Sequence, residues 1–247
     1  MSPSAAGSRR VALAPAYLLH HRPYRDTSRI LEIFARDHGR LTLFARGARG
    51  PHSKLAPVLR PFCPLLVSWS GRGEAAQLTA CEAAYEAQAL PRAHLMAGFY
   101  LNELLLKLTT RHDPQSALFD EYHRALEGLK AGAPVEPVLR LFEKHLLETL
   151  GYGLDLIAEA VNGRAIEAAA YYHFRPTHGL ACTVPESPGA FAGCSLIALA
   201  REDLSDPRTL DDARRLLRSA LAQCLDGREL STRAVARAIA TRRETGR

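Results

Sequence analysis

Five short apolar segments, separated by turn-forming residues, restrict the first third of this chain to a small β-sheet fold. Separators such as Asp37-His38-Gly39 contain the glycine and polar residues that tight turns use. Five short strands within about eighty residues are typical of a small barrel, and we predict an OB-fold. An SH3-like barrel fits the same pattern nearly as well. The segments are 11–20, 27–35, 41–45, 65–69 and 76–85.

Near residue 90 the apolar pattern changes to a helical period. Leucines at helical spacing predict a helix over 95–109. The pairs Asp113-Pro114 and Asp206-Pro207 are typical of helix starts, because aspartate caps free backbone amides and proline fits the first turn. A helix over 137–150 is expected to stop at Gly151, since glycine readily takes the left-handed conformation.

These elements predict an α+β protein with two domains. The first is an N-terminal OB-fold β-barrel over 1–82, and the second is an all-helical domain over 83–247. The helical domain is interrupted by an irregular insert at about 154–193. Within the insert, β-prone residues at 171–174 and 180–184 flank a turn, which predicts a small hairpin.

The positive charge is concentrated in the first third of the chain. Residues 1–80 hold 12 Lys/Arg and 4 Asp/Glu, whereas residues 81–247 hold 20 and 22, and the formal net charge is +6. This asymmetry favours a polyanionic partner, either nucleic acid or an acidic membrane. No stretch approaches the ~18 uninterrupted apolar residues of a membrane span, and the N-terminus lacks a secretion signal. We therefore expect a cytoplasmic protein without a membrane partner.

Nine cations on the predicted turns and loops of the barrel form a candidate DNA-binding site. Only two acids, Asp26 and Asp37, share those segments. Cations on successive loops can follow a phosphate backbone and give salt-sensitive binding that is independent of base sequence. Tyr24 is the preferred base-stacking residue, ahead of Phe44 and Trp69, because aromatic residues in a small barrel more often belong to its core. The cations are Arg22, Arg25, Arg29, Arg36, Arg40, Arg46, Arg49, Lys54 and Arg60.

The sequence lacks the motifs of common catalytic sites. It contains no P-loop, no complete dinucleotide fingerprint and no nucleophile elbow. A two-metal nuclease needs several converging carboxylates, and the barrel segments hold four scattered ones. We therefore predict no catalytic residue and no enzymatic activity. A DNA-processing nuclease and a scaffold that binds protein or RNA are the alternative functions.

Candidate metal ligands occur mainly in the insert. His173, His178, Cys182 and Cys194 are side chains that bind zinc, but their spacing is irregular and no Cys-x-x-Cys pair is present. The five cysteines of the chain are scattered and odd in number, which indicates reduced thiols rather than disulfides. We predict that the protein binds no metal and no cofactor.

Nine short motifs resemble sequences of the bacterial recombination mediator family RecO, and they occur in the same order as in that family. Each is short, but together they extend over most of the chain. They are YLLHHRPYRDTS (17–28), GRL (39–41), ARGAR (45–49), PF (61–62), LL (65–66), GRGE (71–74), YLNEL (100–104), LRLFE (139–143) and GYG (151–153).

The resemblance to RecO implies an N-terminal OB-fold and a helical C-terminal domain. It implies binding of ssDNA and dsDNA, annealing of complementary strands, and partnership with RecR in loading RecA onto DNA coated by single-strand-binding protein. It also implies that Arg140 grips the acidic C-terminal tail of single-strand-binding protein. A surface ion pair of Arg140 with Glu143 or Glu136 is an equally good interpretation. Some relatives hold zinc through paired cysteines in the insert, and this chain resembles the metal-free branch.

Overall fold

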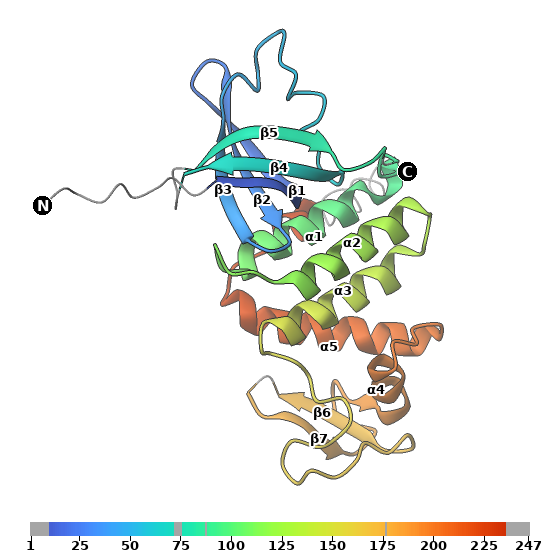
Figure 1. Cartoon of the computed structure of the whole chain (residues 1–247). Coiled ribbons are helices and arrows are strands. Elements are labelled where there is room, and N and C mark those ends of the chain that lie inside the picture. Colours follow the sequence, from blue (N-terminus) through green and yellow to red (C-terminus); the bar gives the residue numbers. More distant parts are fainter. Residues whose placement is uncertain (1–9, 72–75, 87, 176, 236–247) are drawn as a thin grey trace, which may run out of the picture. The chain divides into compact units, whose positions relative to one another are not determined.

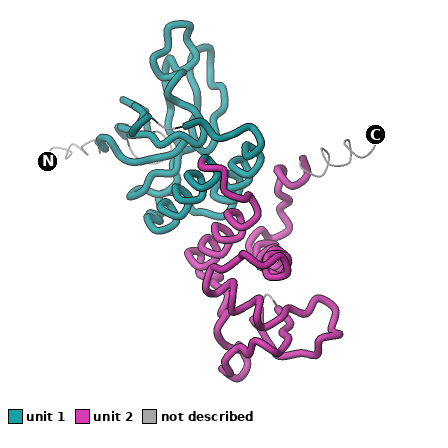
Figure 2. The backbone as a smooth tube through the Cα atoms, turned by 90° about the vertical axis from the view of Figure 1, so that its right-hand side faces the viewer, with its two compact units in different colours: residues 1–130 teal, residues 131–247 magenta. Residues whose placement is uncertain are grey.

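The computed structural model describes residues 10–71, 76–86, 88–175 and 177–235. The chain forms two compact units, residues 1–130 and 131–247 (Figure 2). The first compact unit contains two helices in addition to the barrel. The domain boundary expected after residue 82 stays a prediction. No helix in the described ranges is long and apolar enough to cross a membrane.

The first unit begins with a closed five-stranded barrel in the order β1-β2-β3-β5-β4. Neighbouring strands are antiparallel except β3 and β5, which are parallel. Placing β5 between β3 and β4 gives the Greek-key connectivity of the OB-fold, and the predicted fold class is confirmed. Each predicted segment overlaps one of the strands, and β1 extends four residues beyond the predicted end at residue 20. The strands are β1 (Arg10–Tyr24), β2 (Ser28–Ala35), β3 (Gly39–Ala45), β4 (Pro64–Ser70) and β5 (Gln77–Ala83).

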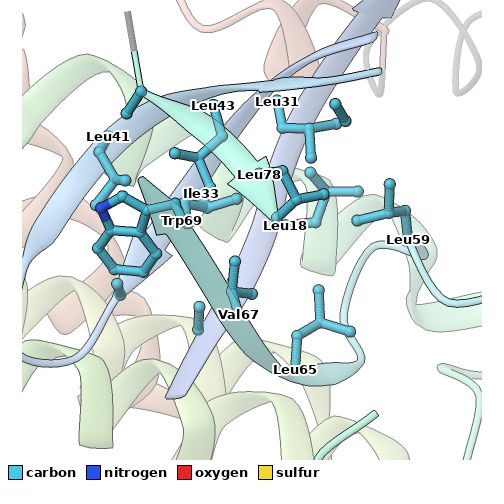
Figure 3. Close-up of a cluster of buried hydrophobic side chains, with 14 of the residues drawn as sticks. Leu18, Leu31, Ile33, Leu41, Leu43, Leu59, Leu65, Val67, Trp69 and Leu78 are labelled. Carbon is cyan, nitrogen blue, oxygen red and sulfur yellow. The ribbon is translucent and has the colours of Figure 1, made fainter. Parts of the chain in front are cut away.

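The barrel interior is filled by aliphatic side chains from all five strands (Figure 3). Alternation along β2 directs Leu31 and Ile33 inward, as expected for a strand with a period of two. Leu59, from the loop between β3 and β4, also enters this core and anchors the loop. Trp69 is buried in the same core, so it is not available to stack on a nucleic-acid base.

Two helices, α1 (Leu95–Leu108) and α2 (Ser116–Lys130), complete the first unit. The ring of Phe34, on the outer face of β2, lies 5.6 Å from Phe119 and 6.4 Å from Tyr122, both on α2. Tyr17 of β1 packs against the same two rings, at 5.4 and 5.0 Å. The outer face of β1 and β2 is therefore buried by aromatic contacts with α2.

The predicted cap of α2 at Asp113 is wrong, because the helix begins at Ser116. The segment before α2 runs along the turn between β2 and β3, where the His112 amide donates to the Arg40 carbonyl at 2.9 Å. Gly39 has φ +67°, and a Cβ there would lie 2.1 Å from the Asp113 carbonyl oxygen. This close backbone approach holds Asp113 outside the helix.

Among its described residues, the second unit contains α3, α4, α5, a helical stretch at residues 231–235 and the insert sheet. As predicted, α3 stops before Gly151, which has φ +78°, and Asp206 caps α5 by accepting the Thr209 amide at 2.7 Å. The predicted hairpin is β6–β7, and β8 extends it to a sheet in the order β7-β6-β8. No sequence pattern above predicts β8 or α4. The elements are α3 (Val135–Thr149), β6 (Tyr171–Arg175), β7 (Gly179–Thr183), β8 (Phe191–Ala192), α4 (Gly193–Ala200) and α5 (Pro207–Leu225).

Candidate nucleic-acid interface

Seven of the nine predicted cations lie on two neighbouring segments at one end of the barrel. The segments are the end of the β1–β2 hairpin and the β3–β4 loop, which project from the barrel beside each other in Figure 1. We call this group the basic loop surface. Its members are Arg22, Arg25, Arg29, Arg46, Arg49, Lys54 and Arg60.

One backbone hydrogen bond and one side-chain hydrogen bond, both donated by Arg49, hold the two segments of the basic loop surface together. The Arg49 amide donates to the Thr27 carbonyl at 2.8 Å, and the Arg49 guanidinium approaches the Arg25 carbonyl at 3.4 Å. Arg25 has φ +50°, a left-handed conformation that turns the hairpin tightly. Since Leu59 is anchored in the barrel core, the cations between Arg46 and Arg60 are carried by a loop that is fixed at both ends.

The basic loop surface carries an unbalanced positive charge. Within the described residues, none of its seven cations forms an ion pair. Asp26 is the one acid within 22–30 and 46–63. Burial lowers the pKa of the nearby His21, and the Arg29 cation lowers it further, so this imidazole is neutral at pH 7. A surface of this kind attracts phosphates and releases their counterions when it binds.

The other two predicted cations, Arg36 and Arg40, lie at the β2–β3 turn and have carboxylate partners. Arg36 makes a two-pronged contact with Asp120 of α2, at 2.9 and 3.0 Å. Arg40 contacts Glu32 at 3.3 Å and the Thr109 carbonyl at 2.9 Å. Sequence reasoning missed these partners, because Asp120 and Thr109 lie far along the chain and no local pattern links them to the turn.

One aromatic pair lies beside the basic loop surface. The Tyr24 ring packs edge-on against Phe44 with centroids 5.4 Å apart, and the Arg25 guanidinium lies 5.2 Å from the Tyr24 centroid. Tyr24 is partly exposed. The predicted stacking residue is therefore next to the cations, and its role in binding stays a prediction.

Comparison with known proteins assigns the chain to a family. The family model for the N-terminal part of recombination protein O matches residues 11–86, and the model for its C-terminal part matches residues 92–234. The chain belongs to the RecO family. This confirms the resemblance inferred from the motifs.

RecO relatives match nearly the whole chain. The DNA repair protein RecO of Methylococcus capsulatus is 47% identical over 226 residues, which is 91% of this chain and 92% of the relative. The protein of that name from Nitrosococcus oceani is 44% identical over 226 residues, with the same coverage. The one from Ralstonia nicotianae is 41% identical over 236 residues, 94% of this chain and 86% of the relative.

Arg140, the peptide-binding residue implied by the RecO resemblance, is buried on α3. Its side chain is 7% exposed and lies 2.9 Å from the Glu143 carboxylate, which is fully buried, and 4.0 Å from Glu136. The ion pair considered as the alternative is therefore present, although it is buried rather than on the surface. The role of Arg140 in gripping an acidic tail stays a prediction.

Three of the four candidate zinc ligands share a cavity in the insert. His173, His178 and Cys182 line a space of about 450 Å³, and Cys194, at the start of α4, is not part of its lining. Over the described ranges, no three His, Cys, Asp or Glu side chains are grouped closely enough to hold a metal ion. The absence of a cofactor stays a prediction.

Proposed function

We propose that this protein is a non-catalytic mediator of DNA repair and homologous recombination that binds ssDNA and dsDNA. The basic loop surface is the observation that supports the proposal most strongly, because seven cations without ion pairs among the described residues share one end of an OB-fold barrel. The relatives named DNA repair protein RecO support the biological role.

Binding occurs through the phosphate backbone. Each phosphate that meets an arginine or lysine releases condensed counterions, so affinity falls as salt concentration rises and depends little on base sequence. Two complementary strands held on such a surface no longer repel each other fully, which promotes their annealing. With RecR, and through the tail of single-strand-binding protein, the protein helps RecA to load in the bacterial cytoplasm and nucleoid.

Fluorescence anisotropy of a labelled strand of ~30 nucleotides, titrated at several salt concentrations, tests the proposal. We expect the variant Arg46→Glu/Arg49→Glu to bind the strand at least ~10-fold more weakly and with a shallower salt dependence, because two phosphate contacts are lost. The variant Arg124→Glu/Arg214→Glu is a control with the same change of charge, since both arginines are exposed and lie on helices. Wild-type affinity in Arg46→Glu/Arg49→Glu would refute the proposed surface.

Incubation of labelled DNA with the protein and Mg²⁺ distinguishes a mediator from a nuclease. We expect the DNA to stay intact. Degradation that copurifies with the protein and disappears with EDTA would favour the enzyme instead.

A further inference from the structure

A second aromatic pair lies where the β3–β4 loop ends. Phe62 follows Arg60 by two residues, and its ring packs edge-on against Phe99 of α1, with centroids 5.1 Å apart. Phe62 is 4% exposed, whereas Phe99 is 43% exposed. The buried ring thus supports a neighbouring ring that is open to solvent.

The local backbone fixes this aromatic pair in place. Phe62 has φ +65°, a left-handed conformation that a bulky residue adopts only when its surroundings demand it. Its ring lies over Gly98, where a Cβ would come within 2.8 Å of Phe62 and 2.7 Å of Leu90. Glycine at 98 therefore leaves room for Phe62, and Phe62 in turn orients Phe99.

The segments that lead into Phe62 and Phe99 carry cations that suit a polyanion, although Glu82 and Glu86, in and just after β5, are also exposed. Arg60 is two residues from Phe62, and Arg92 is exposed in the short 3-10 helix η2 (Arg92–His94) that leads into α1. The β3–β4 loop holds no acid between Arg46 and Phe62. On α1 the nearest acid is Glu103, one turn after Phe99, and it forms an ion pair with Lys107 at 3.4 Å.

The β3–β4 loop is consequently flanked by an aromatic pair at each end. Tyr24 and Phe44 lie at its start, Phe62 and Phe99 lie at its end, and Arg46, Arg49, Lys54 and Arg60 lie between. Stacking platforms combined with a cationic track are how proteins hold single strands, because unpaired bases offer their faces to aromatic rings and the cations contact the phosphates. The bases of a duplex are already stacked on one another.

We propose that Phe99 stacks on an unpaired base and that the β3–β4 loop with its two aromatic pairs is a binding site for single-stranded DNA. This inference rests on the proposed DNA-binding function and extends the site from the barrel onto α1. Duplex DNA contacts the cations of the same loop without using the aromatic rings.

The test compares Phe99→Ala with the wild-type protein on a 30-nucleotide oligo(dT) strand and on a 30-base-pair duplex. We expect Phe99→Ala to bind oligo(dT) about fivefold or more weakly, since a base–aromatic stack contributes about 1–3 kcal/mol. Its duplex affinity and salt dependence should stay unchanged, because no charge is removed. Leu13→Ala is the matched control, since Leu13 is an exposed apolar residue on β1 of the same unit, and it should leave both affinities unchanged.

The variant Phe99→Trp gives a readout that a purely structural role would not produce. The chain has a single tryptophan, Trp69, which is buried. A second tryptophan at position 99 should retain oligo(dT) affinity, and its fluorescence should be quenched by oligo(dT) and not by the duplex.

The negative results of these tests distinguish a failure of the stacking site from a failure of the proposed function. Wild-type oligo(dT) affinity in Phe99→Ala, with no quenching of Phe99→Trp, overturns the stacking site, while salt-sensitive duplex binding still supports the proposed function. If the same variant loses RecR binding instead, Phe99 belongs to a protein interface and the stacking proposal is wrong. If the wild-type protein binds neither DNA, the proposed function itself fails.

Discussion

Replacing Glu32 with glutamine tests whether Arg40 serves the fold or is available to a DNA strand. The Glu32 carboxylate accepts hydrogen bonds from Thr42 at 2.8 Å, from Arg40 at 3.3 Å and from Arg111 at 2.9 Å. The side chain of Glu32 is 16% exposed and that of Arg40 is 14% exposed. Because both are mostly removed from water, solvent can replace the lost contacts only in part.

We expect Glu32→Gln to lower the free energy of unfolding by about 2 kcal/mol. The contact with Arg40 contributes about 1.5 kcal/mol as a charge-assisted bond away from water, and the bond from Thr42 contributes about 1 kcal/mol. The Arg111 side chain is 41% exposed, so solvent screening limits its contribution to less than about 1 kcal/mol. The amide oxygen of glutamine can still accept some of these hydrogen bonds, so part of their stabilising free energy is retained.

Urea unfolding followed by the fluorescence of Trp69, which lies in the barrel core, measures this loss directly. Arg124→Gln is the control, because its ion pair with Glu121 is on an exposed side chain and should contribute less than about 0.5 kcal/mol. Arg40→Gln should destabilise the protein yet leave the folded protein with wild-type DNA affinity. A loss below about 0.5 kcal/mol in Glu32→Gln, or DNA binding weakened by Arg40→Gln as much as by Arg46→Glu, would contradict the structural role.

Three further predictions concern pH, a helix cap and the buried pair on α3. The pKa of His21 is lowered in the folded protein, so the unfolded chain binds the extra proton and stability should fall as pH drops through about 6.5; thermal melts of His21→Gln should show a weaker fall. Asp206→Ala removes the acceptor of the Thr209 amide and should cost about 1 kcal/mol in chemical denaturation. Arg140→Ala removes the cation beside the fully buried Glu143 and should lower the free energy of unfolding by about 3 kcal/mol. A loss of tail-peptide binding in this variant supports a binding role for Arg140 only if circular dichroism shows that the variant is folded.

The strands of the barrel are predictable from sequence because their signal is local. In β2, residues 30–35 are apolar on both faces except for Glu32, which predicts a strand but does not show what covers its outer side. The covering rings, Phe119 and Tyr122, come from α2, roughly ninety residues further along the chain. A pattern with a period of two contains no information about contacts at that separation.

The candidate DNA-binding site, like the barrel strands, could be predicted only where its signal is local in the sequence. The density of cations in 22–60 identifies the basic loop surface, since charge and turn positions can be read locally. The same density does not distinguish Arg46, which is exposed and has no ion pair in the described structure, from Arg36, which is paired with Asp120. Phe99 was missed because a phenylalanine within a leucine-rich helix looks like a core residue, whereas in the structure its side chain is 43% exposed.

The aromatic contacts between the barrel and α2 also affect how the chain folds during synthesis. All five strands have been made once Ala83 is joined, but Tyr17 and Phe34 gain their covering rings only as α2, which ends at Lys130, is completed. At 5–20 residues per second, the intervening 47 residues take about 2–9 s to translate. During that interval the nascent barrel exposes two large aromatic side chains to solvent and to chaperones. A fragment that ends near residue 86 would keep them exposed permanently and should aggregate, whereas one that ends at residue 130 should not.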